Sequence, residues 1–154
     1  MFNITILAVG KIKEKKYREG VEEYLKRVKP YARVVVHELE SEPFSKNNKK
    51  QSKDTEALKI IKYLDKQEGK FVIALDEKGQ HFTSKEFSEF LSTKNQEIIF
   101  IIGGSLGLSQ EIFEKVNAKI SLSKMTFPHE VARLLLCEQI YRAITIEKGK
   151  VYHY

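Results

Sequence analysis

The feature that restricts the fold most is a regular alternation of short apolar runs with amphipathic stretches. Strands are expected in five apolar or valine-rich runs, at residues 2–9, 33–39, 71–75, 98–102 and 119–122. Apolar residues at helical spacing follow each run. Residues 71–75 are apolar without interruption, which is typical of a strand covered on both faces. The alternation therefore predicts an α/β fold, with a mostly parallel sheet flanked by helices.

Local signals give the expected ends of the helices and loops. Pro30 stops the first helix. The polar stretch 40–53 predicts a mobile loop, and the next helix has Ser52 or Asp54 available as its cap. Further signals are a turn at 76–79, a capping box formed by Thr83 and Glu86, a helix over 109–116, and a final helix that starts near Pro128 with Thr126 as its cap.

Length and charge narrow the class of protein. At 154 residues, the chain is expected to form one domain over residues 1–154. The 27 Lys+Arg exceed the 21 Asp+Glu, and lysines crowd residues 11–18 and 46–53. This excess favours a nucleic-acid partner, although each cluster alone is more typical of a solvated surface. Cys137 has no disulfide partner, so a cytoplasmic location is the default and Cys137 is expected to fill the core.

Three loops are expected to meet where a ligand can bind. In parallel sheets, ligands lie outside the carboxyl ends of the strands, and here the loops are 75–79, 103–107 and 121–128. The glycine turn at 103–107 matches neither a dinucleotide fingerprint nor a phosphate-binding loop. By itself, such a turn is also explained by tight packing.

The final helix combines candidate chemistry with an apolar surface. His129 lies in its first turn, where the positive helix end favours a neutral imidazole that can accept a proton. A histidine that is only bonded locally explains the same position. Arg133 follows one turn later, and Glu138 with Arg142 forms an i,i+4 pair. The helix is apolar nearly all round, which predicts cover on two sides, one of them by a second copy of the chain.

The chain ends on Tyr152, His153 and Tyr154. Ends usually fray, but these rings could instead stack on a base or close a pocket. The four histidines and single cysteine show no metal-ligand spacing, so no metal is expected. A Ser-His-Asp triad is not expected, and hydrolase chemistry is disfavoured.

Several motifs together resemble one family. These are IIGGSLGL, SLSKMTFPHEVARLLLCEQIYRA and the terminal YH, supported by the opening ITILAVGKIKEKKYREGVEEYLKR. In them the chain resembles the ribosomal RNA large subunit methyltransferase H family, a member of the SPOUT class. The resemblance covers essentially the whole sequence. This chain differs from the family pattern at Glu130, where many members carry glutamine, and at Tyr154, where a basic residue often ends the chain.

The resemblance implies a fold, a reaction and partners. It implies a carboxyl-terminal trefoil knot, a homodimer formed through the final helix, and S-adenosylmethionine as methyl donor. The implied acceptor is N3 of pseudouridine 1915 in 23S rRNA of the assembled ribosome. Two alternatives remain open from the residues: an RNA-binding module without catalysis, and a SPOUT enzyme that acts on transfer RNA.

The resemblance also implies roles for particular residues. The residues expected around the methyl donor are Leu75, Gly103, Leu122, Ser123, Lys124, Met125, Thr126 and Phe127. Those expected near the methyl-transfer site are His129, Arg133, Tyr152 and His153. In this interpretation, His129 or His153 removes the N3 proton while an arginine stabilises the resulting anion.

Overall fold

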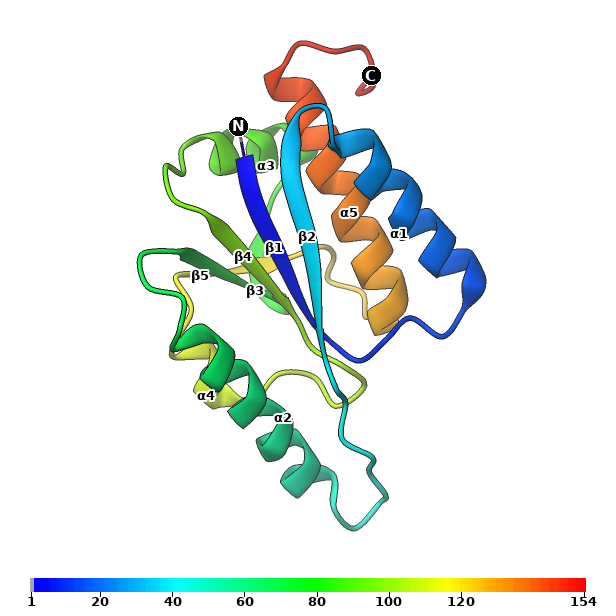
Figure 1. Ribbon diagram of the computed structural model, residues 1–154, viewed down its shortest axis with the longest axis vertical. Coiled ribbons are helices and arrows are strands. Elements are labelled where there is room, and N and C mark those ends of the chain that lie inside the picture. Colours follow the sequence, from blue (N-terminus) through cyan, green and yellow to red (C-terminus); the bar gives the residue numbers. More distant parts are fainter. Residues whose placement is uncertain (1) are drawn as a thin grey trace.

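A parallel sheet forms the centre of the molecule. A computed structural model describes residues 2–154 (Figure 1). Within them, five strands lie in the order β2-β1-β4-β3-β5, and neighbouring strands pair in parallel. The strands are β1 (Phe2–Val9), β2 (Ala32–Leu39), β3 (Phe71–His81), β4 (Ile98–Ile102) and β5 (Ala118–Ser121). The predicted fold class is confirmed.

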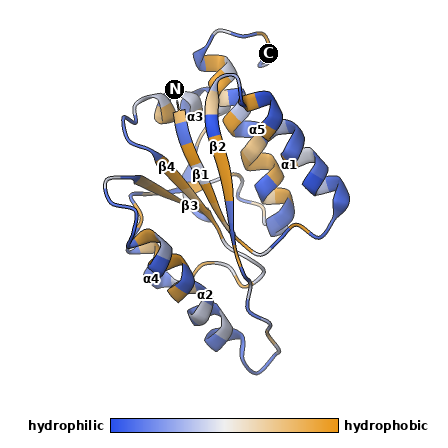
Figure 2. Cartoon of the chain, in the orientation of Figure 1, coloured by the Kyte–Doolittle hydropathy of each residue, from blue (hydrophilic) through white to orange (hydrophobic). Residues whose placement is uncertain are grey.

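Helices cover both faces of this sheet. The helices are α1 (Lys15–Val28), α2 (Lys49–Leu64), α3 (Ser84–Ser92), α4 (Gln110–Phe113) and α5 (His129–Glu147). One core packs α1, α3 and α5 against Ile4, Ile73 and Phe100. The other packs α2 and α4 against Leu7 and Ile101. Apart from the second half of β3, the inner strands are accordingly mostly apolar (Figure 2), and every residue of β4 is buried.

The loop predicted over 40–53 is wrong in its last part, because α2 already begins at Lys49. Ser52 and Asp54 therefore lie inside the helix and do not cap it. Asn48 is the N-cap residue, without a side-chain cap bond. Ser52 is buried, and its hydroxyl donates to the Pro43 carbonyl at 2.9 Å. This contact holds the preceding segment against the first turn of the helix.

The helix predicted over 109–116 is also wrong in length, since α4 is a single turn from Gln110 to Phe113. A distant contact ends it. Asn117 donates its backbone N–H to the Val72 carbonyl at 2.8 Å, and its side-chain oxygen accepts from the Val72 N–H at 2.7 Å. These two bonds draw the chain into β5 before the helical pattern is complete.

Strand β3 continues past the predicted turn at 76–79 and ends at His81. Its pairing with β5 breaks between Leu75 and Gln80, both of which lie opposite Ile120. Gly79 is tightly enclosed there, because a Cβ atom at this position would lie 2.7 Å from the Ile120 nitrogen. Only glycine fits this approach of two backbones. The trefoil knot stays a prediction.

The start of α5 differs from the predicted cap. Pro128 is the N-cap residue, and the Thr126 hydroxyl donates instead to a Glu77 carboxylate oxygen at 2.5 Å. The capping box of Thr83 and Glu86 on α3 is confirmed. No helix within residues 2–154 combines the length and apolar character needed to cross a bilayer.

Glu130, in the first turn of α5, ties that helix to the segment before α1. Its Oε1 accepts from the backbone N–H groups of Lys13 at 2.9 Å and Glu14 at 3.0 Å. We expect Glu130→Ala to lower the free energy of unfolding by about 1–2 kcal/mol, since bonds to a charged acceptor contribute most. Glu130→Gln keeps an acceptor oxygen and should cost less than half as much. Urea unfolding of both variants checks this, and equal losses would contradict it.

Candidate functional site

A cavity of about 870 Å³ opens at the carboxyl ends of β3, β4 and β5. The three loops expected at this edge form its walls. All the residues predicted around the methyl donor line it except Lys124, which is exposed outside the lining. The lining members of that set are Leu75, Gly103, Leu122, Ser123, Met125, Thr126 and Phe127.

The glycine turn after β4 is packed closely against itself. A Cβ atom at Gly103 would lie 3.0 Å from the Gly107 carbonyl carbon and 3.1 Å from the Leu108 side chain. Gly107 has a φ of 75°, which glycine adopts without strain. The absence of side chains thus keeps the turn tight and leaves the cavity open beside it.

Several lining residues were not among the predicted site residues. They include Asp76, Glu77 and Lys78 after the first part of β3, Ser105 in the glycine turn, and Gln110 and Phe113 on α4. The bond between Thr126 and Glu77 joins two of the three loops. Their position directly after predicted strands was the available signal. The two lining residues on α4 belong to a helix that the sequence pattern predicted to be longer than it is.

The resulting cavity has both apolar and charged walls. Leu75, Ile102 and Phe127 offer flat or branched apolar surface, while Asp76 and Glu77 supply carboxylates. Such a mixture suits a ligand with an aromatic ring, hydroxyls and a positive charge. A smaller hollow of about 220 Å³ adjoins it beneath α3 and α5, and it shares Leu75, Leu122 and Phe127 as common walls.

Of the residues predicted near methyl transfer, only His129 lines the large cavity. Arg133 is 2% exposed, and its guanidinium instead pairs with Glu38 of β2 at 2.5 Å and donates to the Gly10 carbonyl at 2.8 Å. Arg133 thus connects α5 to the ends of β1 and β2. Within this chain its charged group is already engaged by protein partners.

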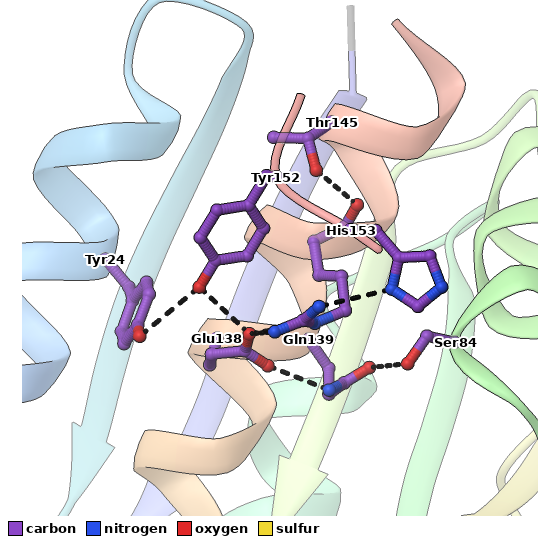
Figure 3. Close-up of polar contacts among 8 residues, drawn as sticks. Tyr24, Ser84, Glu138, Gln139, Thr145, Tyr152 and His153 are labelled. Atoms are coloured by element: carbon purple, nitrogen blue, oxygen red, sulfur yellow. Dashed lines mark hydrogen bonds and ion pairs between the residues drawn. The ribbon is translucent and has the colours of Figure 1, made fainter. Parts of the chain in front are cut away.

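Tyr152 and His153 pack against the second half of α5, beyond the turn that carries His129 (Figure 3). The Tyr152 hydroxyl donates to Glu138 at 3.0 Å, and its ring packs edge-on against Tyr141. Arg142 forms two bonds with Glu138 and approaches His153 Nδ1 at 3.1 Å. Because a guanidinium can only donate, His153 Nδ1 accepts in this contact. The terminal rings therefore pack on the helix.

Hydrogen bonding and burial favour the ordinary protonation states of Arg142 and Tyr152. The hydrogen bond to Glu138 raises the pKa of Arg142. Burial, followed by hydrogen bonds with Tyr24 and Glu138, raises the pKa of Tyr152.

Roughly 20 Å of helix separates His129 from Arg142. The structure therefore does not bring the tail to the cavity within one chain.

Cys137 lies in the core on α5, 3% exposed. Burial raises the pKa of its thiol to about 12. Since the thiolate is the reactive form, we expect Cys137 to react slowly with an aromatic disulfide reagent at pH 8 and rapidly after unfolding in guanidinium. The raised pKa also makes the free energy of unfolding depend on pH. The stabilisation from burying the neutral thiol is fully present below the ordinary thiol pKa of about 8.5, and it is lost as pH rises towards 12. Rapid reaction of the folded protein would contradict core placement.

Comparisons with known proteins agree with the fold and identify the family. A family model described as "Predicted SPOUT methyltransferase" matches residues 2–153. The ribosomal RNA large subunit methyltransferase H of Carboxydothermus hydrogenoformans is 47% identical, over 97% of this chain and 98% of that protein. The protein of the same name from Clostridium kluyveri is 45% identical, over 98% and 99%. A probable methylase family protein from Haemophilus influenzae Rd KW20 shares the fold, with a TM-score of 0.59, 14% identity, and coverage of 99% of this chain and 71% of that one.

Proposed function

Because the chain belongs to the SPOUT methyltransferase family, we propose that it methylates 23S rRNA of the large ribosomal subunit, with S-adenosylmethionine as donor and N3 of pseudouridine 1915 as acceptor. The relatives' names support ribosomal RNA as the substrate class. The observation that carries the proposal is the cavity built by the loops after β3, β4 and β5. The whole chain, residues 1–154, is taken as one catalytic domain.

The cavity fits the proposed donor in size and chemistry. Its volume of about 870 Å³ lies within the range of small-molecule sites. Leu75, Leu122 and Phe127 can sandwich a purine ring, and the backbone of residues 122–127 can bond its edge. Asp76 and Glu77 can face hydroxyls or positive charge. The donor, when bound, supplies a methyl group already activated by a sulfonium, without a metal.

The remaining task of the protein is to align the acceptor and to accept its proton. N3 of a pyrimidine has a free lone pair only after its proton leaves. His129 borders the cavity at the start of α5, so we assign it first as the proton acceptor, with His153 as the alternative. Alignment of the methyl donor with the acceptor nitrogen contributes most of the rest of the rate enhancement. Arg133, Tyr152 and His153 stay proposed site residues.

A homodimer through α5 is part of the proposal. The sides of α5 pack on α1 and α3, while Val131 and Leu135 stay half-exposed on this largely apolar helix. A second copy covering this helix removes that apolar surface from water. It is also the route by which Tyr152 and His153 of the partner could approach a cavity that they do not reach in one chain.

The direct test is the location of the added methyl group. Ribosomes that lack the modification are incubated with the protein and isotopically labelled donor, and the digested 23S rRNA is analysed by mass spectrometry. We expect one labelled methyl on N3 of pseudouridine 1915. Label at another nucleotide would change the acceptor, and no label together with no donor binding would favour an RNA-binding module without catalysis.

A further inference from the structure

Building on the proposed ribosomal substrate, we propose that the segment from Phe44 to Lys53 is a docking surface for single-stranded RNA. In this proposal, Phe44 stacks on an unpaired base, and Lys46, Lys49, Lys50 and Lys53 contact the adjacent phosphates. The segment lies outside the donor cavity and contains none of the residues assigned to methyl transfer. We call these residues the lysine segment.

The lysine segment carries uncompensated positive charge. No acidic residue occurs between Phe44 and Lys53. In the part of the chain that the structure describes, none of the recorded salt bridges uses its four lysines, whereas the nearby Lys59 pairs with Glu42 at 2.6 Å. Free lysines that release counterions from phosphates are the main source of affinity for nucleic acids.

Phe44 is the second observation, because it places an aromatic ring in water beside these charges. Its exposed fraction is 44%, and the other large exposed apolar residues from 2 to 154 are aliphatic except for Tyr154 at the chain end. Aromatic rings interleaved with basic groups are the usual surface for single-stranded nucleic acid, since every base has a face that can stack. A membrane surface would favour several exposed apolar side chains together.

The segment is held in place before any partner binds. Glu56, 5% exposed, accepts from the Glu42 N–H at 2.9 Å, and Ser52 donates to Pro43 at 2.9 Å. On the other side of Phe44, the Ser45 N–H donates to the Asn48 side chain at 2.5 Å. Fixing the backbone on both sides of the ring lowers the entropy cost of binding.

The position relative to the cavity also suits one continuous RNA strand. Figure 1 shows the segment beyond the carboxyl edge of the sheet, the edge at which the cavity opens. The chain is closely packed between the two regions: Ser41, three residues before the segment, lies beside Gly10, and Val9 lies beside Gly104 of the cavity wall. The lysines in the first turn of α2 are repelled by one another and by the positive end of the helix dipole. A bound phosphate would reduce both of these repulsions.

The test uses the full chain and a fluorescently labelled single-stranded fragment of 23S rRNA that contains the target nucleotide. We expect replacement of the four lysines by glutamine to weaken binding at least about 10-fold and to reduce the slope of log affinity against log salt by about 2–3. The control replaces exposed Lys29, Lys62, Lys66 and Lys115 by glutamine, with the same change in net charge. Equal losses in both variants would overturn the proposed surface.

Phe44 is tested separately. Phe44→Ala should weaken binding about 10-fold with an unchanged salt slope, and Phe44→Leu, which keeps the apolar contact but not the aromatic face, should not restore it. Wild-type affinity for Phe44→Ala would overturn the stacking. Binding of wild-type protein, but not of the lysine variant, to phosphatidylglycerol vesicles with unchanged RNA affinity would assign the surface to a membrane and overturn the RNA proposal.

Two further measurements distinguish this inference from the proposed function. Calorimetry with S-adenosylmethionine should give the wild-type affinity for every variant of the lysine segment. Methylation of ribosomes by the lysine variant should show a raised KM with an unchanged kcat, as expected when only substrate binding is lost. If wild-type protein methylates no RNA, the proposed function fails. If the lysine and Phe44 variants bind RNA as wild type does, only the docking surface fails.

Discussion

Gly103→Val is expected to weaken the binding of S-adenosylmethionine by at least about 100-fold, which corresponds to roughly 2.7 kcal/mol. The first added carbon already meets the Gly107 backbone at 3.0 Å and Leu108 at 3.1 Å. A branched side chain therefore displaces the glycine turn, and four residues of that turn line the cavity. The neighbouring β4 is buried by both cores and should persist. Calorimetry measures the affinity, and circular dichroism checks the fold.

Gly69→Ala is the matched control for Gly103→Val. Gly69 has a φ of 73° and no atom within 4 Å of its potential Cβ. Alanine there costs about 1–2 kcal/mol of backbone strain without touching the cavity. We expect reduced stability with wild-type donor affinity. Wild-type affinity in Gly103→Val would show that the cavity between the three loops is not the donor site, and the methyl-transfer proposal would lose its structural support.

His129→Ala is expected to lower the rate of methyl transfer by about 10²- to 10⁴-fold, the usual contribution of a general base. Its imidazole borders the cavity, and no other histidine is among the lining residues. Donor affinity should change little, because the proposed donor contacts lie in the loops before α5. Single-turnover methylation of ribosomes with saturating protein measures the rate of the chemical step.

His153→Ala decides between the two candidate bases. His153 contacts Arg142 at 3.1 Å, remote from the cavity of its own chain. If His129 is the base, His153→Ala should slow the reaction far less than His129→Ala does. The reverse order would assign the proton to His153 of a partner subunit, and mixed dimers of the two variants would then recover part of the activity. Wild-type rates in both variants would exclude histidine as the base.

Several elements followed from short stretches of sequence. The α3 capping box needs only Thr83 and Glu86, three residues apart, and the structure contains both of its bonds. The apolar run 71–75 predicted a strand covered on both faces, and in β3 Ile73 packs into one core and Val72 into the other. The loops of the cavity were predictable because parallel strands place their carboxyl ends at one edge.

Other features depended on residues far apart in the chain. Asn117 ends α4 through Val72, and Arg133, which the sequence placed on one helical stripe with His129, turns to Glu38 and Gly10. Gly79 is required by the approach of Ile120. None of these partners is visible in a local pattern.

The sequence by itself therefore determined the layers of the fold, the edge at which the cavity opens and the three loops that form most of its walls. Periodicity and caps act over a few residues, and they are strong enough to specify strands, helices and their order. Only the tertiary structure decided which charged side chains are free to act. Arg133 is engaged within the fold, the tail packs against the second half of α5, and Lys46, Lys49 and Lys50 face water. These outcomes depend on contacts that form only when distant segments pack together.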